Sequence, residues 1–135
     1  MIIRGLVLAA GESKRLGQPK QLLTYKGQTL LGHVLTQLEP LLTGVHVVLG
    51  ANESDIKEQT QIQNIISNPS WQKGMGSSLS CGIKNLPDCD AVLVALCDQA
   101  LIPDSHYVEL IALFESYSNH IIATEHKAIG VPAIF

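Results

Sequence analysis

Short apolar segments rich in β-branched residues alternate along this chain with longer segments of helical periodicity, and no other feature of the sequence restricts its fold as strongly. Strands are expected over residues 2–8, 45–49, 62–66, 90–97 and 120–124, and residues 130–135 are expected to enter a further strand. Helices are expected over residues 29–42, 52–59, 77–86 and 104–115, the last three capped by Asn52, by Ser77 or Ser78, and by Asp104 or Ser105. Such alternation is typical of βαβ units around a mostly parallel sheet, so the sequence predicts an α/β protein.

The composition indicates how the core of this sheet is built. Hydrophobic residues make up 46% of the 135 residues but aromatic residues only 4%, so aliphatic side chains must form the core, as in sheets covered by helices on both faces. Residues 90–97 are almost continuously apolar, which is typical of a central strand buried on both faces. The chain contains no internal repeat, low-complexity segment or linker, so we expect a single three-layer α/β/α domain over residues 1–135.

Charge, hydropathy and cysteine usage exclude several classes of partner. Nine Lys and Arg against twelve Asp and Glu give a net charge of −3, so we expect no nucleic-acid partner. Residues 91–96 form the longest later apolar run, which is too short to span a bilayer, and the N-terminal stretch lacks the features of a signal peptide, so we expect no membrane association. Three widely spaced cysteines fit neither a disulfide framework nor a zinc site, and a cytoplasmic location is expected.

The loop after the first expected strand, residues 8–20, concentrates glycine and positive charge. Gly11 and Gly17, with small neighbouring residues, allow backbone N–H groups to approach a ligand closely, and Arg15 and Lys20 add positive charge. The spacing matches neither a P-loop nor a G-x-G-x-x-G fingerprint. We interpret the segment as a cradle for a polyphosphate, and a long connecting loop with solvated charges is the structural alternative.

Two further loops follow expected strands, and ligands of open parallel sheets bind beyond the carboxyl ends of strands. Residues 68–79 are rich in Gly and Ser and lead into a helix whose N-terminus could meet a base, a ribose or a phosphate, although Gly74 and Gly76 could serve only a turn and Trp71 could only cover the core. Asp98 follows the most apolar strand, and a carboxylate there fits a Mg²⁺ ion that substrate phosphates also hold. A cap for the next helix is the alternative for Asp98.

These loops also carry a family resemblance. The pattern Leu-Ala-Ala-Gly-x-Ser-x-Arg-Leu-Gly-x-x-Lys at residues 8–20 resembles the signature of the MobA-like nucleotidyltransferases. The pattern Asn-Pro-x-Trp-x-x-Gly-Met-Gly-Ser-Ser-Leu at residues 68–79 resembles a motif of the molybdenum cofactor cytidylyltransferase branch, and Leu-x-Asp-Gln at residues 96–99 resembles a third motif. The resemblance implies a Rossmann-like nucleoside-diphospho-sugar transferase fold. Ala10 and the Pro19-Lys20 pair favour CTP over GTP.

The resemblance implies transfer of CMP from CTP to the terminal phosphate of a molybdopterin-type cofactor, with Mg²⁺ as cofactor and pyrophosphate as the leaving group. It implies catalytic roles for Arg15, Lys20 and Asp98, with Asp98 as the metal ligand. The residues that it implies for nucleotide binding are Ala9, Ala10, Gly11 and Ser13 near the phosphates, and Asn68, Gly76 and Ser77 near the base or ribose. A molybdoenzyme or its maturation chaperone would be the protein partner.

Some features depart from the family pattern. Ala100 stands where proline is usual after the Asp-Gln pair, and His126 stands where tyrosine is common. Family members continue beyond the point at which this chain stops, so we expect the C-terminal part of the fold to be missing. Two alternatives therefore stay open: nucleotidyl transfer to a sugar phosphate or another phosphorylated acceptor, and a non-catalytic module that binds a nucleotide or a partner.

Overall fold

The computed structural model describes residues 1–13 and 16–135. The strands are β1 (Ile3–Leu8), β2 (Thr24–Tyr25), β3 (Gln28–Thr29), β4 (Gly44–Leu49), β5 (Ile65–Ser67), β6 (Ala91–Leu96), β7 (Ile122–His126) and β8 (Ala128–Ile134). The α-helices are α1 (Leu30–Leu38), α2 (Glu53–Thr60), α3 (Met75–Asn85) and α4 (Asp104–Ser116), and two short 3₁₀ helices are η2 (Lys20–Leu22) and η3 (Trp71–Lys73).

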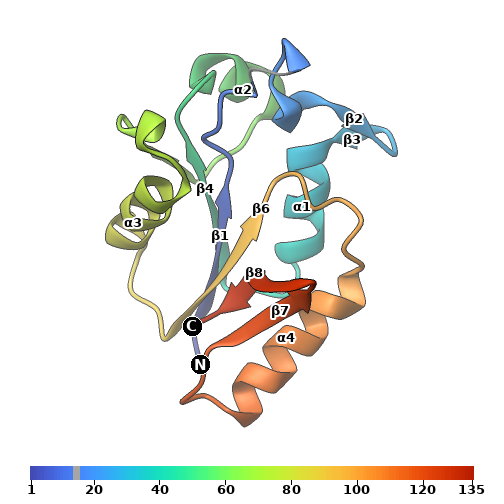
Figure 1. Ribbon diagram of the computed structural model, residues 1–135, viewed down its shortest axis with the longest axis vertical. Helices are drawn as coiled ribbons and strands as arrows, with labels where there is room; N and C mark the ends of the chain where they lie inside the picture. Colours follow the sequence, from blue (N-terminus) through green and yellow to red (C-terminus); the bar gives the residue numbers. More distant parts are fainter. Residues whose placement is uncertain (14–15) are drawn as a thin grey trace.

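Within the described residues, six strands form one sheet in the order β5-β4-β1-β6-β8-β7. The pairs β1–β4, β1–β6 and β4–β5 are parallel, whereas β8 pairs antiparallel with both β6 and β7. β1 therefore lies at the centre, with its carboxyl end beside those of β4 and β6 (Figure 1). The predicted mostly parallel α/β sheet is confirmed, and its antiparallel edge comes from the last two strands.

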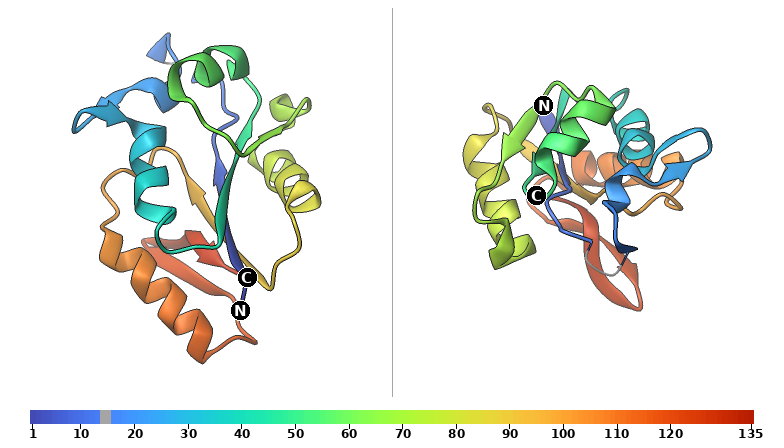
Figure 2. Two further views of the ribbon diagram at one scale, coloured as in Figure 1. Left: turned by 180° about the vertical axis from the view of Figure 1, so that it is seen from behind. Right: turned by 90° about the horizontal axis from the view of Figure 1, so that it is seen from above.

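Helices cover both faces of the sheet, as expected of a three-layer fold. α3 lies on one face and α1 and α4 on the other, which is seen from both sides in Figures 1 and 2. Alternation along the strands divides the core accordingly: Val7 packs with Val34 and Leu93 toward α1, whereas Leu6 packs with Val94 toward α3. This two-sided burial holds the loops at the carboxyl ends of β1 and β6 in place.

Several expected boundaries were wrong, each for a local reason. The helix expected over residues 29–42 ends at Leu38, two residues before Pro40, because proline removes a backbone donor and restricts the residue before it. The strand expected over residues 62–66 begins only at Ile65, where pairing with β4 starts. The strand expected over residues 120–124 is displaced to Ile122–His126 by its pairing with β8.

The expected helix caps also require correction. α3 begins at Met75 with Gly74 as its N-cap, so Ser77 and Ser78 lie inside the first turn and cap nothing. Asn52 is the N-cap of α2, but its left-handed backbone, with φ of 60°, leaves the side chain without a capping bond. Pro103 is the N-cap of α4, and the Asp104 carboxylate accepts a hydrogen bond from Gln37 instead. A tertiary contact thus replaces the expected cap at Asp104, and the backbone conformation prevents it at Asn52.

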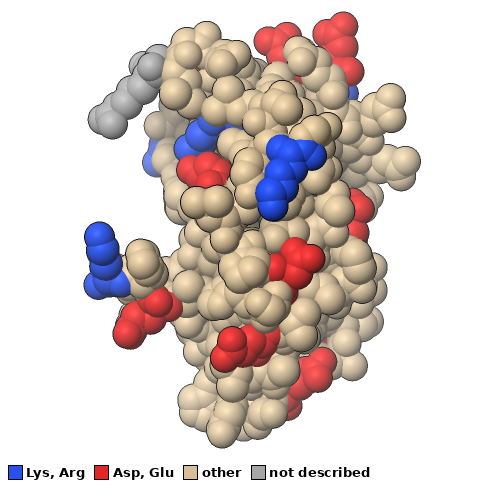
Figure 3. Space-filling view, turned by 90° about the vertical axis from the view of Figure 1, so that its right-hand side faces the viewer, with Lys and Arg blue, Asp and Glu red and all other residues tan. Residues whose placement is uncertain are grey.

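The surface carries charges of both signs. On the face shown in Figure 3, Lys, Arg, Asp and Glu side chains are interspersed among uncharged residues and form no continuous basic patch. This distribution agrees with the small negative net charge of the sequence. Among the described residues, no helix combines the length and apolar character that a bilayer crossing requires.

Candidate functional site

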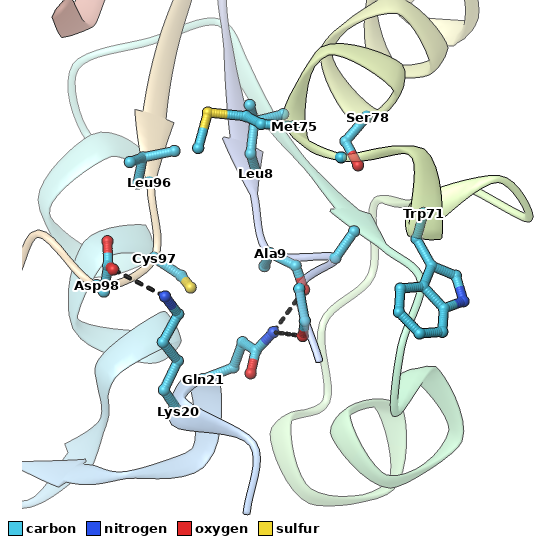
Figure 4. Close-up of a pocket in the computed structure, with 13 residues that line it drawn as sticks. Leu8, Ala9, Lys20, Gln21, Trp71, Met75, Ser78, Leu96, Cys97 and Asp98 are labelled. Atoms are coloured by element: carbon cyan, nitrogen blue, oxygen red, sulfur yellow. Dashed lines mark hydrogen bonds and ion pairs between the residues drawn. The ribbon is translucent and has the colours of Figure 1, made fainter. Parts of the chain in front are cut away.

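A pocket of about 220 Å³ opens where β1 and β6 end. It is lined by Leu8, Ala9, Ala10, Gly11, Lys20, Gln21, Trp71, Gly74, Met75, Ser78, Leu96, Cys97 and Asp98. These residues come from all three loops that the sequence singled out, although the loops lie far apart along the chain. Figure 4 shows Lys20, Gln21 and Asp98 on one side of the pocket, Trp71 and Ser78 on the other, and the end of β1 between them.

The loop after β1 turns its carbonyl groups toward donors of the protein. The Ala9 oxygen accepts from Gln21, the Ala10 oxygen accepts from the Ala51 N–H at 3.1 Å, and the Gly11 oxygen accepts from Gln21. Within the described chain, the N–H groups of Ala10 and Gly11 have no acceptor, and no atom lies within 4 Å of a Cβ built on Gly11. The loop therefore offers open backbone donors to the pocket, as an anion-binding loop does.

Lys20 and Asp98 form an ion pair at the edge of the pocket. The Lys20 Nζ donates to the Asp98 Oδ2 at 2.9 Å, and the two side chains are 38% and 40% exposed. The hydrogen bond to the carboxylate raises the pKa of Lys20, and burial opposes this shift only in part. Lys20 is therefore a fixed positive charge at neutral pH, placed within reach of both the loop after β1 and the end of β6.

Asn68, one of the predicted nucleotide-binding residues, instead has its side chain bonded within the protein. It is 3% exposed, and its Nδ2 donates to the hydroxyl oxygens of Ser77 at 2.9 Å and Ser78 at 3.0 Å. Its Oδ1 accepts from the Ser70 N–H at 3.0 Å. Asn68 thus joins the end of β5 to the first turn of α3 and shapes the loop from within.

Several of the remaining predicted residues do not line the pocket. Gly76 and Ser77 do not line it, and the part of this loop that does is made by Trp71, Gly74, Met75 and Ser78. Ser13 also lies outside the lining, and its hydroxyl oxygen accepts from the Lys20 N–H at 3.2 Å. The roles assigned to Ser13, Asn68, Gly76 and Ser77 remain predictions, and Arg15 lies outside the described residues.

Sequence reasoning missed Gln21 altogether and gave Trp71 and Cys97 no role in binding. Gln21 is fully buried beneath the loop after β1, which a single sequence cannot reveal because glutamine is usually exposed. Trp71 packs on Gly50, which fits the covering role expected from the sequence, and it also forms part of the pocket wall. Burial raises the pKa of the Cys97 thiol to about 12, which keeps it protonated and a poor nucleophile.

The lining contains a single carboxylate, that of Asp98, and the described residues contain no cluster of three or more metal-ligating side chains. Mg²⁺ in proteins commonly uses one or two carboxylates and completes its shell with substrate phosphates and water. The donor set of this pocket therefore fits a divalent ion that binds together with a nucleotide, and it does not resemble a resident metal centre with a full set of protein ligands.

A mostly parallel sheet with open backbone donors after its first strand, beside a lysine and a carboxylate, is typical of α/β proteins that bind ligands beyond the carboxyl ends of their strands. The chain belongs to the family of the MobA-like NTP transferase domain, which matches residues 5–135. The resemblance stated from the three motifs is thereby confirmed at the level of the family, which is a family of nucleotidyltransferases.

Individual relatives carry different names. The chain is 39% identical over 103 residues to the nicotine blue oxidoreductase of Paenarthrobacter nicotinovorans, covering 72% of this chain and 50% of that protein. It is 40% identical over 57 residues to a probable molybdenum cofactor guanylyltransferase of Bacillus cereus strain G9842, covering 42% of this chain and 27% of the relative. The chain thus spans half or less of the length of these curated relatives.

A solved structure supports the fold over nearly the whole chain. The Rv0371c protein of Mycobacterium tuberculosis H37Rv superposes with a TM-score of 0.85 at 25% identity, covering 99% of this chain and 70% of that protein. The same mycobacterial protein has also been solved in complex with manganese, and that structure superposes with a TM-score of 0.74 at 22% identity. The expected transferase-like α/β fold is confirmed by these neighbours.

Proposed function

We propose that this chain transfers CMP from CTP to the terminal phosphate of a molybdopterin-type cofactor and releases pyrophosphate. The convergence of three motif-bearing loops on one pocket, with Lys20 and Asp98 in contact there, carries the proposal. An oxygen of the acceptor phosphate forms a bond to the α-phosphorus of CTP, and the bond from that phosphorus to the bridging oxygen of the β-phosphate breaks. The nucleophile is already an anion, so the site needs charge neutralisation and alignment more than a general base.

The residues divide this work according to their chemistry. The open N–H groups of Ala10 and Gly11 would bind the triphosphate, with Ser13 and Arg15 contributing further donors. Lys20 would neutralise charge near the α-phosphate, since its ammonium stays protonated in this setting. The pocket offers no activated nucleophile that would compete, because the Cys97 thiol is held in its protonated form.

Asp98 would hold a Mg²⁺ ion whose other ligands are phosphate oxygens and water. Such an ion, when bound, supplies positive charge that neutralises the triphosphate and orients it. The manganese complex of the mycobacterial neighbour supports divalent metal use in this fold. Asn68, Gly76 and Ser77 would lie near the base or ribose, and a molybdoenzyme or its chaperone would receive the product.

The choice of CTP rests on Ala10 and on the Pro19-Lys20 pair, the features that favoured CTP over GTP in the sequence. A relative named as a guanylyltransferase makes GTP the competing donor. The direct test incubates the protein with Mg²⁺, with molybdopterin or a sugar phosphate as acceptor, and with CTP, GTP or ATP in turn. Pyrophosphate release and the nucleotide-linked product are measured, the latter by mass spectrometry. We expect turnover with CTP to exceed that with GTP by about tenfold or more, which corresponds to about 1.4 kcal/mol of discrimination.

Each other outcome of this assay has a defined meaning. Faster turnover with GTP would overturn the assignment of the base, and turnover only with a sugar phosphate as acceptor would overturn the assignment of the acceptor. Nucleotide binding without pyrophosphate release would identify a non-catalytic module. Mn²⁺ in place of Mg²⁺ serves as a control for metal identity.

A second candidate follows from the 39% identity to an oxidoreductase and from the apolar part of the pocket lining, which includes Leu8, Trp71, Met75 and Leu96. Such walls would suit an apolar substrate of a redox reaction. Incubation with nicotine blue and with NADH or NADPH as the reductant, followed by absorbance, tests this activity. Consumption of the reduced nicotinamide without any nucleotidyl transfer would favour the second candidate over the first.

A further inference from the structure

Gln21 occupies an unusual position beneath the loop after β1. Its side chain is 0% exposed, and its Nε2 donates to two carbonyl oxygens of that loop, Ala9 at 2.7 Å and Gly11 at 3.2 Å (Figure 4). The amide nitrogen of Gln21 therefore donates to the carbonyl oxygens of two residues of the same loop, one residue apart. No other described side chain bonds these two carbonyl groups.

The carbonyl oxygen of the Gln21 side chain has no hydrogen-bond partner among the described residues. The Gln21 Oε1 is buried, and within the described chain no donor lies in hydrogen-bond range. A buried acceptor without a partner destabilises the folded state, and an apolar side chain of similar length would avoid that loss. The two bonds to the loop, and not the carbonyl oxygen, therefore account for glutamine here.

These two bonds determine which way the loop presents its peptide groups. In a trans peptide the C=O and the following N–H point in opposite directions, so a carbonyl held by Gln21 turns the next N–H away from Gln21. The Ala9 carbonyl thereby orients the N–H of Ala10, which has no acceptor within the described chain. The Ala51 N–H holds the Ala10 carbonyl in the same manner and orients the N–H of Gly11.

We propose that Gln21 is a positioning residue that keeps the loop after β1 in its anion-binding form by holding the Ala9 and Gly11 carbonyl oxygens away from the bound phosphates. The proposal rests on the nucleotide binding proposed above. Without Gln21, either carbonyl oxygen is free to rotate toward the polyanion and repel it. The residue acts through the backbone of the loop and needs no contact with the nucleotide itself.

The test uses Gln21→Met, which keeps the length of the side chain and removes both donors. We expect the affinity for CTP with Mg²⁺, measured by calorimetric titration, to fall by about tenfold, while the affinity for CMP falls much less. The ratio of the CTP and CMP dissociation constants is the decisive readout, because a general loosening of the pocket would weaken both ligands alike. The melting temperature is measured alongside, because the variant removes the unpartnered oxygen but also the donor to the Ala9 and Gly11 carbonyl oxygens.

Gln37→Met provides a matched control within the same chain. Gln37 is also a buried glutamine whose Oε1 has no partner, and its Nε2 donates to the Ile102 carbonyl at 2.7 Å and to the Asp104 carboxylate at 2.8 Å. It does not line the pocket, so its replacement should leave the ratio of CTP to CMP affinity at the wild-type value.

Gln21→Glu keeps the proposal testable if the methionine variant fails to fold. A carboxylate facing two carbonyl oxygens repels them, whereas the protonated carboxyl donates one hydrogen bond. The CTP affinity of this variant, relative to wild type at the same pH, should therefore recover as the pH falls from 8 to 5.5. If the CTP affinity of Gln21→Glu relative to wild type does not change with pH, the proposal is overturned.

The remaining outcomes separate this inference from the proposed function. Wild-type protein that binds no nucleotide overturns both. Wild-type protein that binds CTP, together with a Gln21→Met variant whose ratio of CTP to CMP affinity is unchanged, overturns the role of Gln21 alone and leaves the nucleotide site standing.

Discussion

Gly76 lies exposed in the first turn of α3, where an added methyl group would meet no atom within 4 Å. Because alanine loses less backbone entropy than glycine in a helix, Gly76→Ala should raise the free energy of unfolding by about 0.5–1 kcal/mol. If Gly76 lies near the base or ribose as proposed, the methyl group should at the same time weaken CTP binding. Urea denaturation and calorimetric titration of one preparation measure both effects.

Ser80→Ala is the matched control for Gly76→Ala, because Ser80 lies exposed one turn further along the same helix. It should change helix stability slightly and leave CTP binding as it is. Stabilisation by Gly76→Ala with unaltered CTP affinity would contradict the assignment of Gly76 to the nucleotide site.

Single residues of the pocket differ in how well the sequence revealed them. Ala10, Gly11, Lys20 and Asp98 could be predicted because they follow buried strands, and open parallel sheets gather ligands at that edge. Gln21 could not be predicted, because its burial depends on how η2 packs against the loop after β1, and no pattern in the sequence indicates that packing.

At the scale of elements, Gln99 joins the end of β6 to β8. Its Oε1 accepts from the Leu96 N–H at 3.1 Å, and its Nε2 donates to the Val131 carbonyl at 3.0 Å. Gln99→Leu leaves both backbone groups without partners, so the free energy of unfolding should fall by about 1–3 kcal/mol. Urea denaturation measures this change.

Gln59→Leu on the exposed surface of α2 controls for the added apolar side chain and should shift the unfolding midpoint little. An equal loss in the two variants would show that the Gln99 bonds contribute nothing. Because Asp98 lies inside the turn that Gln99 closes, the same bonds also fix where the carboxylate stands.

The long buried strands were the most predictable elements, because residues 91–96 are apolar throughout and residues 3–8 are interrupted only by Arg4 and Gly5. The β2–β3 hairpin was not predicted at all. Each of its strands has two residues, too few for an alternating pattern, and its signal is confined to Gly27, whose φ of 82° suits a tight turn. The starts of α2 and α4 were predicted to within one residue, whereas α3 begins before the expected Ser77 and the expected capping bonds were wrong.

At the scale of the whole molecule, His46 makes stability depend on pH. Burial, and to a smaller extent the Arg4 charge, lower the pKa of His46 below its ordinary value of 6.5. The unfolded chain then binds a proton more readily than the folded chain does. Stability should therefore be complete above pH 6.5 and decline as the pH falls through the folded-state pKa.

His46→Gln isolates this contribution, because the variant lacks the titrating group at that position. Unfolding midpoints measured from pH 7.5 to pH 5 should fall more steeply for wild type than for the variant. Parallel curves over that range would show that His46 does not contribute to the acid sensitivity of the protein.

Lys20 and Asp98 neutralise each other at the edge of the pocket. A nucleotide phosphate that takes over Lys20 would strand the Asp98 carboxylate opposite a polyanion, and a cation that takes over Asp98 would strand Lys20. An anion or a cation that binds alone would therefore leave one charge of the pair without its partner. If the site binds a nucleotide with a divalent ion as proposed, each ligand should bind more tightly in the presence of the other.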